Sequence, residues 1–212
     1  MFYNGYYFLG MHLIWWFIWL IMLLWILALP YNIPAKWIKK SSFIYAFWNW
    51  LNTEKTIPPD SLKRIGIAAD HAGFELKNYL VKMLVESGYE VTDYGNSELE
   101  PTDDYPDYVI PMARAVASGA MSRGIAVCGS GVGACIVANK VPGVRACLIH
   151  EKFSARQGVE DDNMNVICLG GKVVHNAFAW KLISIFLAAK FSGLERHVRR
   201  LSEVTKFENS QK

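Results

Sequence analysis

The sequence predicts an α/β domain over residues 64–212, a Rossmann-like sheet of five parallel strands covered by helices on both faces. Short apolar runs of strand length alternate there with longer amphipathic runs, which is typical of a parallel sheet buried on both sides. Polar residues follow directly after three of the short runs, where open sheets of this kind bind their ligands. A long apolar run near the N-terminus predicts a transmembrane helix ahead of the domain.

The elements of the domain follow in order from the hydrophobic pattern. Five runs rich in small and β-branched apolar residues predict strands at 64–69, 90–94, 124–127, 146–149 and 165–169. Amphipathic stretches between and after them predict helices at 74–87, 108–118, 132–140, 153–160, 176–189 and 194–207.

The N-terminal apolar run extends over residues 8–29, and its only ionisable member is His12. A helix of that length, at ~1.5 Å per residue, spans a hydrocarbon core of ~30 Å. No Lys or Arg precedes the run, whereas three lysines follow it closely, so its C-terminal side is expected in the cytoplasm. A cleaved signal peptide is the alternative, but it would have a basic start and a shorter apolar core. We therefore expect a transmembrane anchor at 1–30 and a membrane-anchored protein whose catalytic domain is cytoplasmic.

Residues 31–63 predict a linker, because prolines punctuate this stretch. Its aromatic-rich piece at 43–51 suits either the membrane interface or a small hairpin packed on the domain, and the sequence leaves both open.

Charge and cysteine content exclude some classes of function. The chain has a net charge of +3, of which its first 60 residues supply +2, with four lysines against Glu54 and Asp60. The domain is therefore nearly neutral, which argues against a nucleic-acid partner. The four cysteines lack metal-type spacing and suit free thiols in a reducing compartment.

A glycine-rich turn after the third predicted strand is the strongest local signal, with the sequence Cys-Gly-Ser-Gly-Val-Gly from Cys128. It sets a thiol beside the hydroxyl of Ser130, and its glycines allow a close approach of main-chain amides to an anion. The turn is neither a Walker A loop, which ends in Gly-Lys-Ser/Thr, nor a dinucleotide fingerprint. A tight strand-to-helix turn with a buried cysteine is the alternative. The loop glycines are Gly129, Gly131 and Gly133.

Two further clusters suit a phosphorylated ligand. Asp70 and His71 directly follow the first strand, where the pair can handle a sugar oxygen or a phosphate, or where Asp70 simply caps a helix. Arg196 and Arg200 are four residues apart on the last predicted helix and so share a face, which fits either a phosphate clamp or a solvated basic surface.

Taken together, these motifs resemble the type B ribose-5-phosphate isomerases, a family grouped with the galactose-6-phosphate isomerase subunits. The resemblance covers residues 64 to about 207 and rests on four motifs in matching order. They are Asp-His-x-Gly-Phe after the first strand, Asp104-Tyr105-Pro106, the Cys-Gly-Ser-Gly-Val-Gly turn, and Arg-His-x-x-Arg near the end.

The resemblance implies an aldose–ketose isomerase that works through a cis-enediolate without metal or cofactor. Cys128 then corresponds to the base that moves a proton between C2 and C1, and its thiol pKa of ~8.5 must fall for work at neutral pH. Ser130 corresponds to the residue that handles the hydroxyl proton, and the loop amides form the anion hole. Asp70 and His71 correspond to residues that contact the ring oxygen and the phosphate side.

The resemblance also implies a binding site shared between two subunits of a homodimer. Its expected substrate-binding residues are Tyr105 at the pocket wall, the loop glycines, Asp162, Lys172, Arg196 and Arg200. The arginines are expected to bind phosphate, and one arginine cluster to serve the neighbouring subunit.

Two departures from the family pattern concern the substrate. Asp161 stands where the family commonly has a ring-opening histidine, so Asp161 acts in its place, His150 substitutes, or the substrate needs no ring opening. Lys172 stands where relatives often have an arginine, which keeps the charge and loses the bidentate fork.

We therefore expect a sugar-phosphate isomerase, with ribose 5-phosphate and ribulose 5-phosphate as the default pair. A tetrose phosphate, or a hexose such as galactose or allose 6-phosphate, is the alternative within the class. The alternative from another class is a non-catalytic, membrane-bound sugar-phosphate sensor.

Overall fold

The computed structural model of the chain describes residues 63–210, which belong to one compact unit. Within this part the predicted sheet is confirmed. Five parallel strands lie in the order β2-β1-β3-β5-β4, with β3 at the centre. Their bounds are β1 Arg64–Ala69, β2 Glu90–Asp93, β3 Arg123–Cys128, β4 Ala146–Leu148 and β5 Val166–Gly170.

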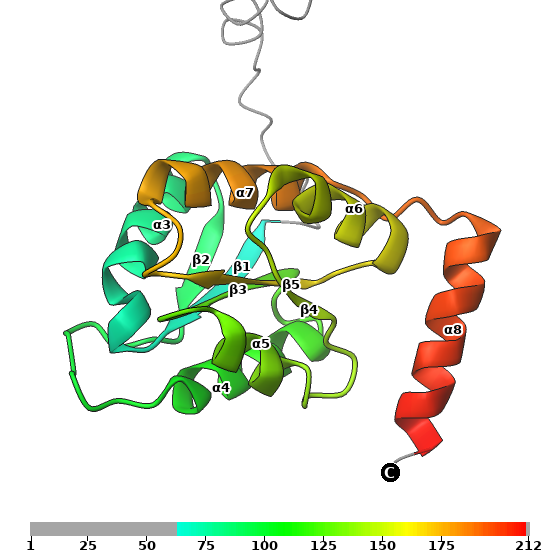
Figure 1. Cartoon of the computed structure of the whole chain (residues 1–212), viewed down its shortest axis with the longest axis horizontal. Coiled ribbons are helices and arrows are strands. Elements are labelled where there is room, and N and C mark those ends of the chain that lie inside the picture. The colour runs from blue at the N-terminus through cyan, green and yellow to red at the C-terminus, as the bar shows by residue number, and fades with distance from the viewer. Residues whose placement is uncertain (1–62, 211–212) are drawn as a thin grey trace, which may run out of the picture. The chain divides into compact units, whose positions relative to one another are not determined.

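Helices cover both faces of the sheet, as expected. Figure 1 shows α3, α6 and α7 on one face and α4 and α5 on the other. Their bounds are α3 Phe74–Glu86, α4 Tyr105–Ala117, α5 Val132–Ala138, α6 Lys152–Asp162 and α7 Asn176–Ala188, and a short 3-10 helix, η3, spans His71–Gly73. Helix α4 begins three residues before its predicted start, because Pro106 lies in its first turn, where a missing N–H costs nothing.

The side chains of β3 alternate between two cores, one on each face of the sheet. Ile125 and Val127 pack with α3 and α7, whereas Ala126 and Cys128 pack with α4 and α5. All six residues of β3 are buried. The thiol of Cys128 is thus held at the end of a rigid central strand, toward the α4 side.

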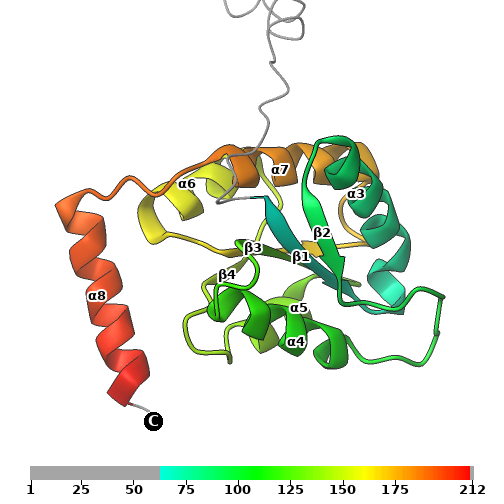
Figure 2. The same cartoon turned by 180° about the vertical axis from the view of Figure 1, so that it is seen from behind.

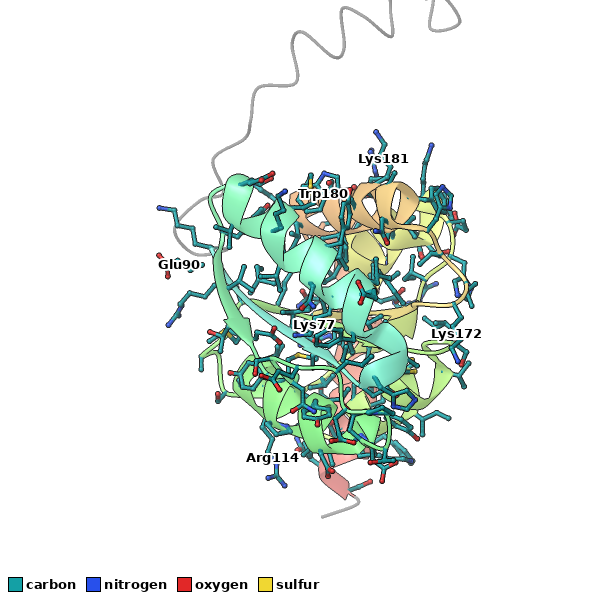
Figure 3. The ribbon with its side chains drawn as sticks, turned by 90° about the vertical axis from the view of Figure 1, so that its left-hand side faces the viewer. Lys77, Glu90, Arg114, Lys172, Trp180 and Lys181 are labelled. Carbon is teal, nitrogen blue, oxygen red and sulfur yellow. The ribbon has the colours of Figure 1, made fainter. Side chains whose placement is uncertain are left out.

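Because all the strands are parallel, their C-terminal ends meet at one edge of the domain, here called the carboxyl edge. Asp70 follows β1, the glycine loop follows β3, and Gly171 and Lys172 follow β5 there. Figure 3 views the domain from this side and labels Lys172 at the rim and Lys77, a buried residue of α3.

The last helix, α8 Glu195–Ser210, lies on the far side of the domain from the carboxyl edge (Figures 1 and 2). Two contacts hold it there: His197 Nε2 lies 3.4 Å from Asp161 Oδ1, and the Gly143 amide donates to Glu208 Oε1 at 3.0 Å. Asp161 precedes β5 and Gly143 precedes β4, so both anchoring points lie at the amino ends of strands.

The predicted membrane localisation is corrected by the structure. Among residues 63–210, no helix has the length and apolar character needed to cross a membrane. A crossing takes about 20 apolar residues, whereas the apolar helix α7 has 13 residues. The anchor predicted at 1–30 lies outside the described residues, as does nearly all of the linker at 31–63. The localisation expected from that run is wrong for the part of the chain that the structure describes.

Candidate active site

The glycine loop folds back onto the thiol of Cys128. The Gly131 amide donates to Cys128 Sγ at 3.2 Å, and the Cys128 side chain is 5% exposed. The loop therefore places a main-chain donor directly against the sulfur. Gly131 has φ +83°, and a Cβ there would lie 2.5 Å from Leu148 Cδ1 and 2.8 Å from the Leu169 carbonyl carbon. The loop therefore requires glycine at 131 for both its backbone conformation and its packing.

Tyr105 and Lys172 border this loop. A Cβ on Gly133 would lie 2.6 Å from Tyr105 Cζ, so the tyrosine ring packs on the loop backbone. On the other side, the Lys172 amide donates to the Gly129 carbonyl at 3.0 Å, and the Gly171 amide donates to the Cys128 carbonyl at 2.8 Å. The exposed Ser130 hydroxyl accepts from the Val132 amide at 3.4 Å. Tyr105, Lys172, Ser130 and Cys128 thus all border or belong to the glycine loop.

Asp70 closes the edge of the site beside β1. Its Oδ1 accepts hydrogen bonds from the amides of Ala72 at 3.0 Å and Gly73 at 3.2 Å. Asp70 therefore caps the short helix η3, which was the alternative to ligand binding in the sequence analysis. Burial raises the pKa of this carboxyl above its ordinary value, against the opposing effect of these amides and of His71. The cap seats η3 against the glycine loop, where a Cβ on Gly129 would lie 3.5 Å from that of Ala72.

His71 is paired with Asp103, which the sequence analysis did not single out. His71 Nδ1 lies 2.8 Å from Asp103 Oδ1, and the His71 amide donates to the same oxygen at 2.7 Å. The Asp103 side chain is 6% exposed and the His71 side chain 39%. Nothing in the acidic stretch from Glu98 to Asp104 marks residue 103 as different, because only the tertiary fold brings it to His71.

The pairing shifts the pKa of both groups. The hydrogen bond that the His71 ring donates to the Asp103 carboxylate raises the pKa of His71 above its ordinary value. Burial alone would raise the pKa of Asp103, but hydrogen bonds from the His71 amide, the His71 ring and Tyr108 outweigh it, and the pKa falls. The pair therefore favours an imidazolium beside a carboxylate.

Four other residues expected in the site lie elsewhere in the subunit. Asp161, Asp162, Arg196 and Arg200 are at or near the amino edge, across the domain from Cys128. Asp161 accepts from Gln157 Nε2 at 2.9 Å and faces His197, while Arg196 Nε donates to His197 Nε2 at 2.8 Å. One subunit alone does not bring these residues to the thiol.

His150 is on the carboxyl edge but follows β4, the edge strand. Its side chain is exposed, and the strand β5 lies between β4 and β3. That His150 substitutes for the ring-opening histidine stays a prediction.

The four cysteines are free, as expected. Cys135 on α5 and Cys168 on β5 share a hydrogen bond, which lowers the pKa of Cys135 to about 7 and contributes to raising that of Cys168 well above its ordinary value. Cys128 is the one of the four whose sulfur accepts a hydrogen bond from the glycine loop.

Comparison with known proteins places this site in a family. The model of the Ribose/Galactose Isomerase family matches residues 65–204. The chain belongs to that family. The ribose-5-phosphate isomerase B of Escherichia coli is 40% identical over 147 residues, which cover 69% of this chain and 97% of that protein. The D-erythrulose-4-phosphate isomerase of Pectobacterium atrosepticum is 40% identical over 129 residues, 61% of this chain and 85% of that protein.

A solved structure agrees with this membership. The ribose-5-phosphate isomerase B of Clostridium thermocellum superposes with a TM-score of 0.67 at 39% identity, covering 70% of this chain and 99% of that one. The family match begins with β1 and ends within α8, so it includes both the carboxyl edge and the arginine motif.

Proposed function

We propose that this ribose/galactose isomerase family member interconverts ribose 5-phosphate and ribulose 5-phosphate through a cis-enediolate, with Cys128 as the base. The observation that supports this most directly is the thiol at the end of β3, which receives the Gly131 amide within a loop of further amides. Proton transfer between neighbouring carbons needs such a base beside donors that stabilise charge on oxygen.

In this mechanism, different residues of the carboxyl edge transfer protons, stabilise charge and contact the sugar. The Cys128 thiolate takes the proton from C2 of the open-chain aldose, and the electron pair moves into the C1–C2 bond as charge collects on O1. The amides from Gly129 to Gly133 stabilise that charge. Ser130 relays the hydroxyl proton between O2 and O1, and the thiol returns its own proton to C1. Asp70, Tyr105 and Lys172 border the bound sugar.

The phosphate group requires a second subunit in this proposal. Arg196 and Arg200 are on α8, on the far side of their own domain from Cys128. A twofold homodimer would bring the α8 of one subunit to the carboxyl edge of the other. Asp161 and Asp162, which end α6 next to α8, would come with it. Exposed apolar side chains on and before α8 support such an interface, namely Leu194, Val198, Val204 and Phe207 at 48%, 48%, 58% and 68% exposure.

Replacing Val198 with aspartate is expected to give a folded monomer with little isomerase activity. A charge in the apolar part of α8 must be desolvated when the helix docks, which disfavours association and leaves each site without its arginines. Sedimentation velocity and the rate of ribulose 5-phosphate formation measure the two effects. Glu203→Gln, on the same helix, is the matched control and should stay dimeric. A fully active monomeric variant would contradict the shared site.

A tetrose phosphate is the second candidate substrate. Asp161 stands where the resemblance places a histidine, and a four-carbon aldose 4-phosphate cannot close a ring through its phosphorylated oxygen. The similarity to the erythrulose-4-phosphate enzyme supports the same candidate. For a hexose phosphate, the support is that the family description also names galactose isomerases.

The full-length chain should be assayed against aldose phosphates of four, five and six carbons. We expect kcat/KM to be highest for ribose 5-phosphate. A higher kcat/KM for erythrose 4-phosphate would change the proposed substrate but not the proposed type of reaction. Tight binding of these aldose phosphates without turnover would indicate a sensor and overturn the enzymatic proposal.

A further inference from the structure

Ribose 5-phosphate in water is mainly a furanose ring, so its C1–O4 bond must open before Cys128 can act on C2. Opening requires a group that moves a proton from the C1 hydroxyl to the ring oxygen. In the proposed dimer Asp161 would approach the partner's carboxyl edge, but its two carboxylate oxygens already contact Gln157 and His197. The carboxyl edge, however, holds a titratable pair of its own.

His71 has the geometry of an oriented acid–base group. Its Nδ1 is fixed by Asp103, and within residues 63–210 no hydrogen bond to its Nε2 is present. The residue follows β1, which is hydrogen-bonded to β3 up to the pair Ala69 and Val127, one residue before the thiol. A partly exposed imidazole with one nitrogen held by a buried carboxylate has its other nitrogen available for substrate.

Asp103 is itself held in place from the other side. Asn96 Nδ2 donates to Asp103 Oδ2 at 3.2 Å, which leaves Oδ1 for the two bonds from His71. The buried ammonium of Lys77, 1% exposed and paired with Asp93, donates to the Asn96 carbonyl at 2.8 Å. A chain of contacts therefore runs from the interior beneath α3 to the imidazole (Figure 3 labels Lys77).

We propose that His71 opens the sugar ring and that Asp103 is its positioning residue, a role that rests on the proposed isomerase function. The neutral imidazole takes the proton of the C1 hydroxyl at Nε2. The C1–O4 bond breaks, its electron pair goes to O4, and a carbonyl forms at C1. His71 then returns the proton to O4, so the step consumes no other reactant. Asp103 stabilises the transient imidazolium and fixes the tautomer that leaves Nε2 free.

The reverse reaction separates ring opening from proton transfer at carbon. Ribulose 5-phosphate is open-chain, because its O5 carries the phosphate and closure from O4 would give a four-membered ring. Exchange of its C1 hydrogen with deuterium from solvent thus needs the enediolate and Cys128, but no ring opening. Ribose 5-phosphate consumption needs both.

In Asp103→Asn, kcat for ribose 5-phosphate should fall about 10²-fold, while C1 exchange into ribulose 5-phosphate changes less than about twofold. His71→Asn should show the same split. In both variants, ribose 5-phosphate consumption should stop rising with enzyme concentration once spontaneous ring opening limits it. Asp107→Asn, an exposed acid in the first turn of α4, is the matched control and should behave as the wild type.

The pH dependence of ribose 5-phosphate turnover gives a second test, because it would not shift if Asp103 had only a structural role. The charged groups that act on His71 are Asp103 and Asp70, and both raise its pKa. Because the base form of His71 is active, ribose 5-phosphate turnover falls as pH drops through that pKa. Removing the charge of Asp103 should move this acid limb to lower pH, while the acid limb of C1 exchange stays in place.

Three results would overturn the assignment. An equal loss of turnover and exchange in Asp103→Asn would mean that Asp103 only shapes the loop. No loss in either would remove the pair from the reaction. A selective loss of ribose 5-phosphate turnover in Asp161→Asn, with Asp103→Asn unaffected, would assign ring opening to Asp161. If the wild type performs neither reaction, it is the proposed function that fails.

Discussion

Cys128→Ala is expected to reduce isomerisation by about 10²- to 10⁴-fold in kcat, the range that a positioned acid–base group contributes. Alanine has no group that can take the C2 proton. The phosphate-binding groups and the loop backbone stay in place, so the affinity for a phosphorylated ligand should change little. The measurements are ribulose 5-phosphate formation, C1 deuterium exchange, and calorimetric binding of the substrate.

Cys147→Ala is the matched control for that variant. Cys147 is an exposed cysteine on the edge strand β4, and its loss should leave turnover as in the wild type. Full activity in Cys128→Ala would remove the thiol from the mechanism. A joint loss of activity and ligand binding would point to collapse of the loop instead.

The second large effect concerns the arginines of α8. Arg196→Ala combined with Arg200→Ala should raise KM for ribose 5-phosphate by about 10²-fold or more, because each charge-assisted bond to phosphate contributes about 1.5–3 kcal/mol. Because the two side chains belong to the partner's site in the proposed dimer, their loss should be repaired in trans.

Mixing this double variant with Cys128→Ala provides the decisive form of the experiment. After unfolding and refolding together, about half of the dimers are mixed, and each mixed dimer has one site with both its thiol and its arginines. About a quarter of wild-type activity should return from two nearly inactive proteins. No recovery, in a mixture shown to contain heterodimers, would place the thiol and its arginines in the same subunit.

The fold was accessible from the sequence because its signals are local. The buried strands β1, β3 and β5 are continuous apolar runs, and the observed bounds differ from the predicted ones by one residue at most. The glycine loop was equally local, since the φ of Gly131 and its contact with the thiol arise within a few residues of β3.

The contacts that were missed are those between distant segments. Asp103 contacts His71 across 32 positions of the chain, and it lies in a stretch that also holds Glu98, Glu100 and Asp104. Likewise, His197 and Asp161 pair only because α8 packs back on α6, a contact that amphipathic periodicity does not contain. The predicted localisation was wrong for a different reason, because it assigned a location to the whole protein from one apolar run.

The position of α8 has a consequence for how the protein behaves on dilution. In the proposed dimer, the arginines of one subunit complete the site that holds the other subunit's thiol, so catalysis would require both subunits. Below the concentration at which subunits separate, every molecule would be intact and none would turn over. Specific activity then reports association as directly as it reports chemistry.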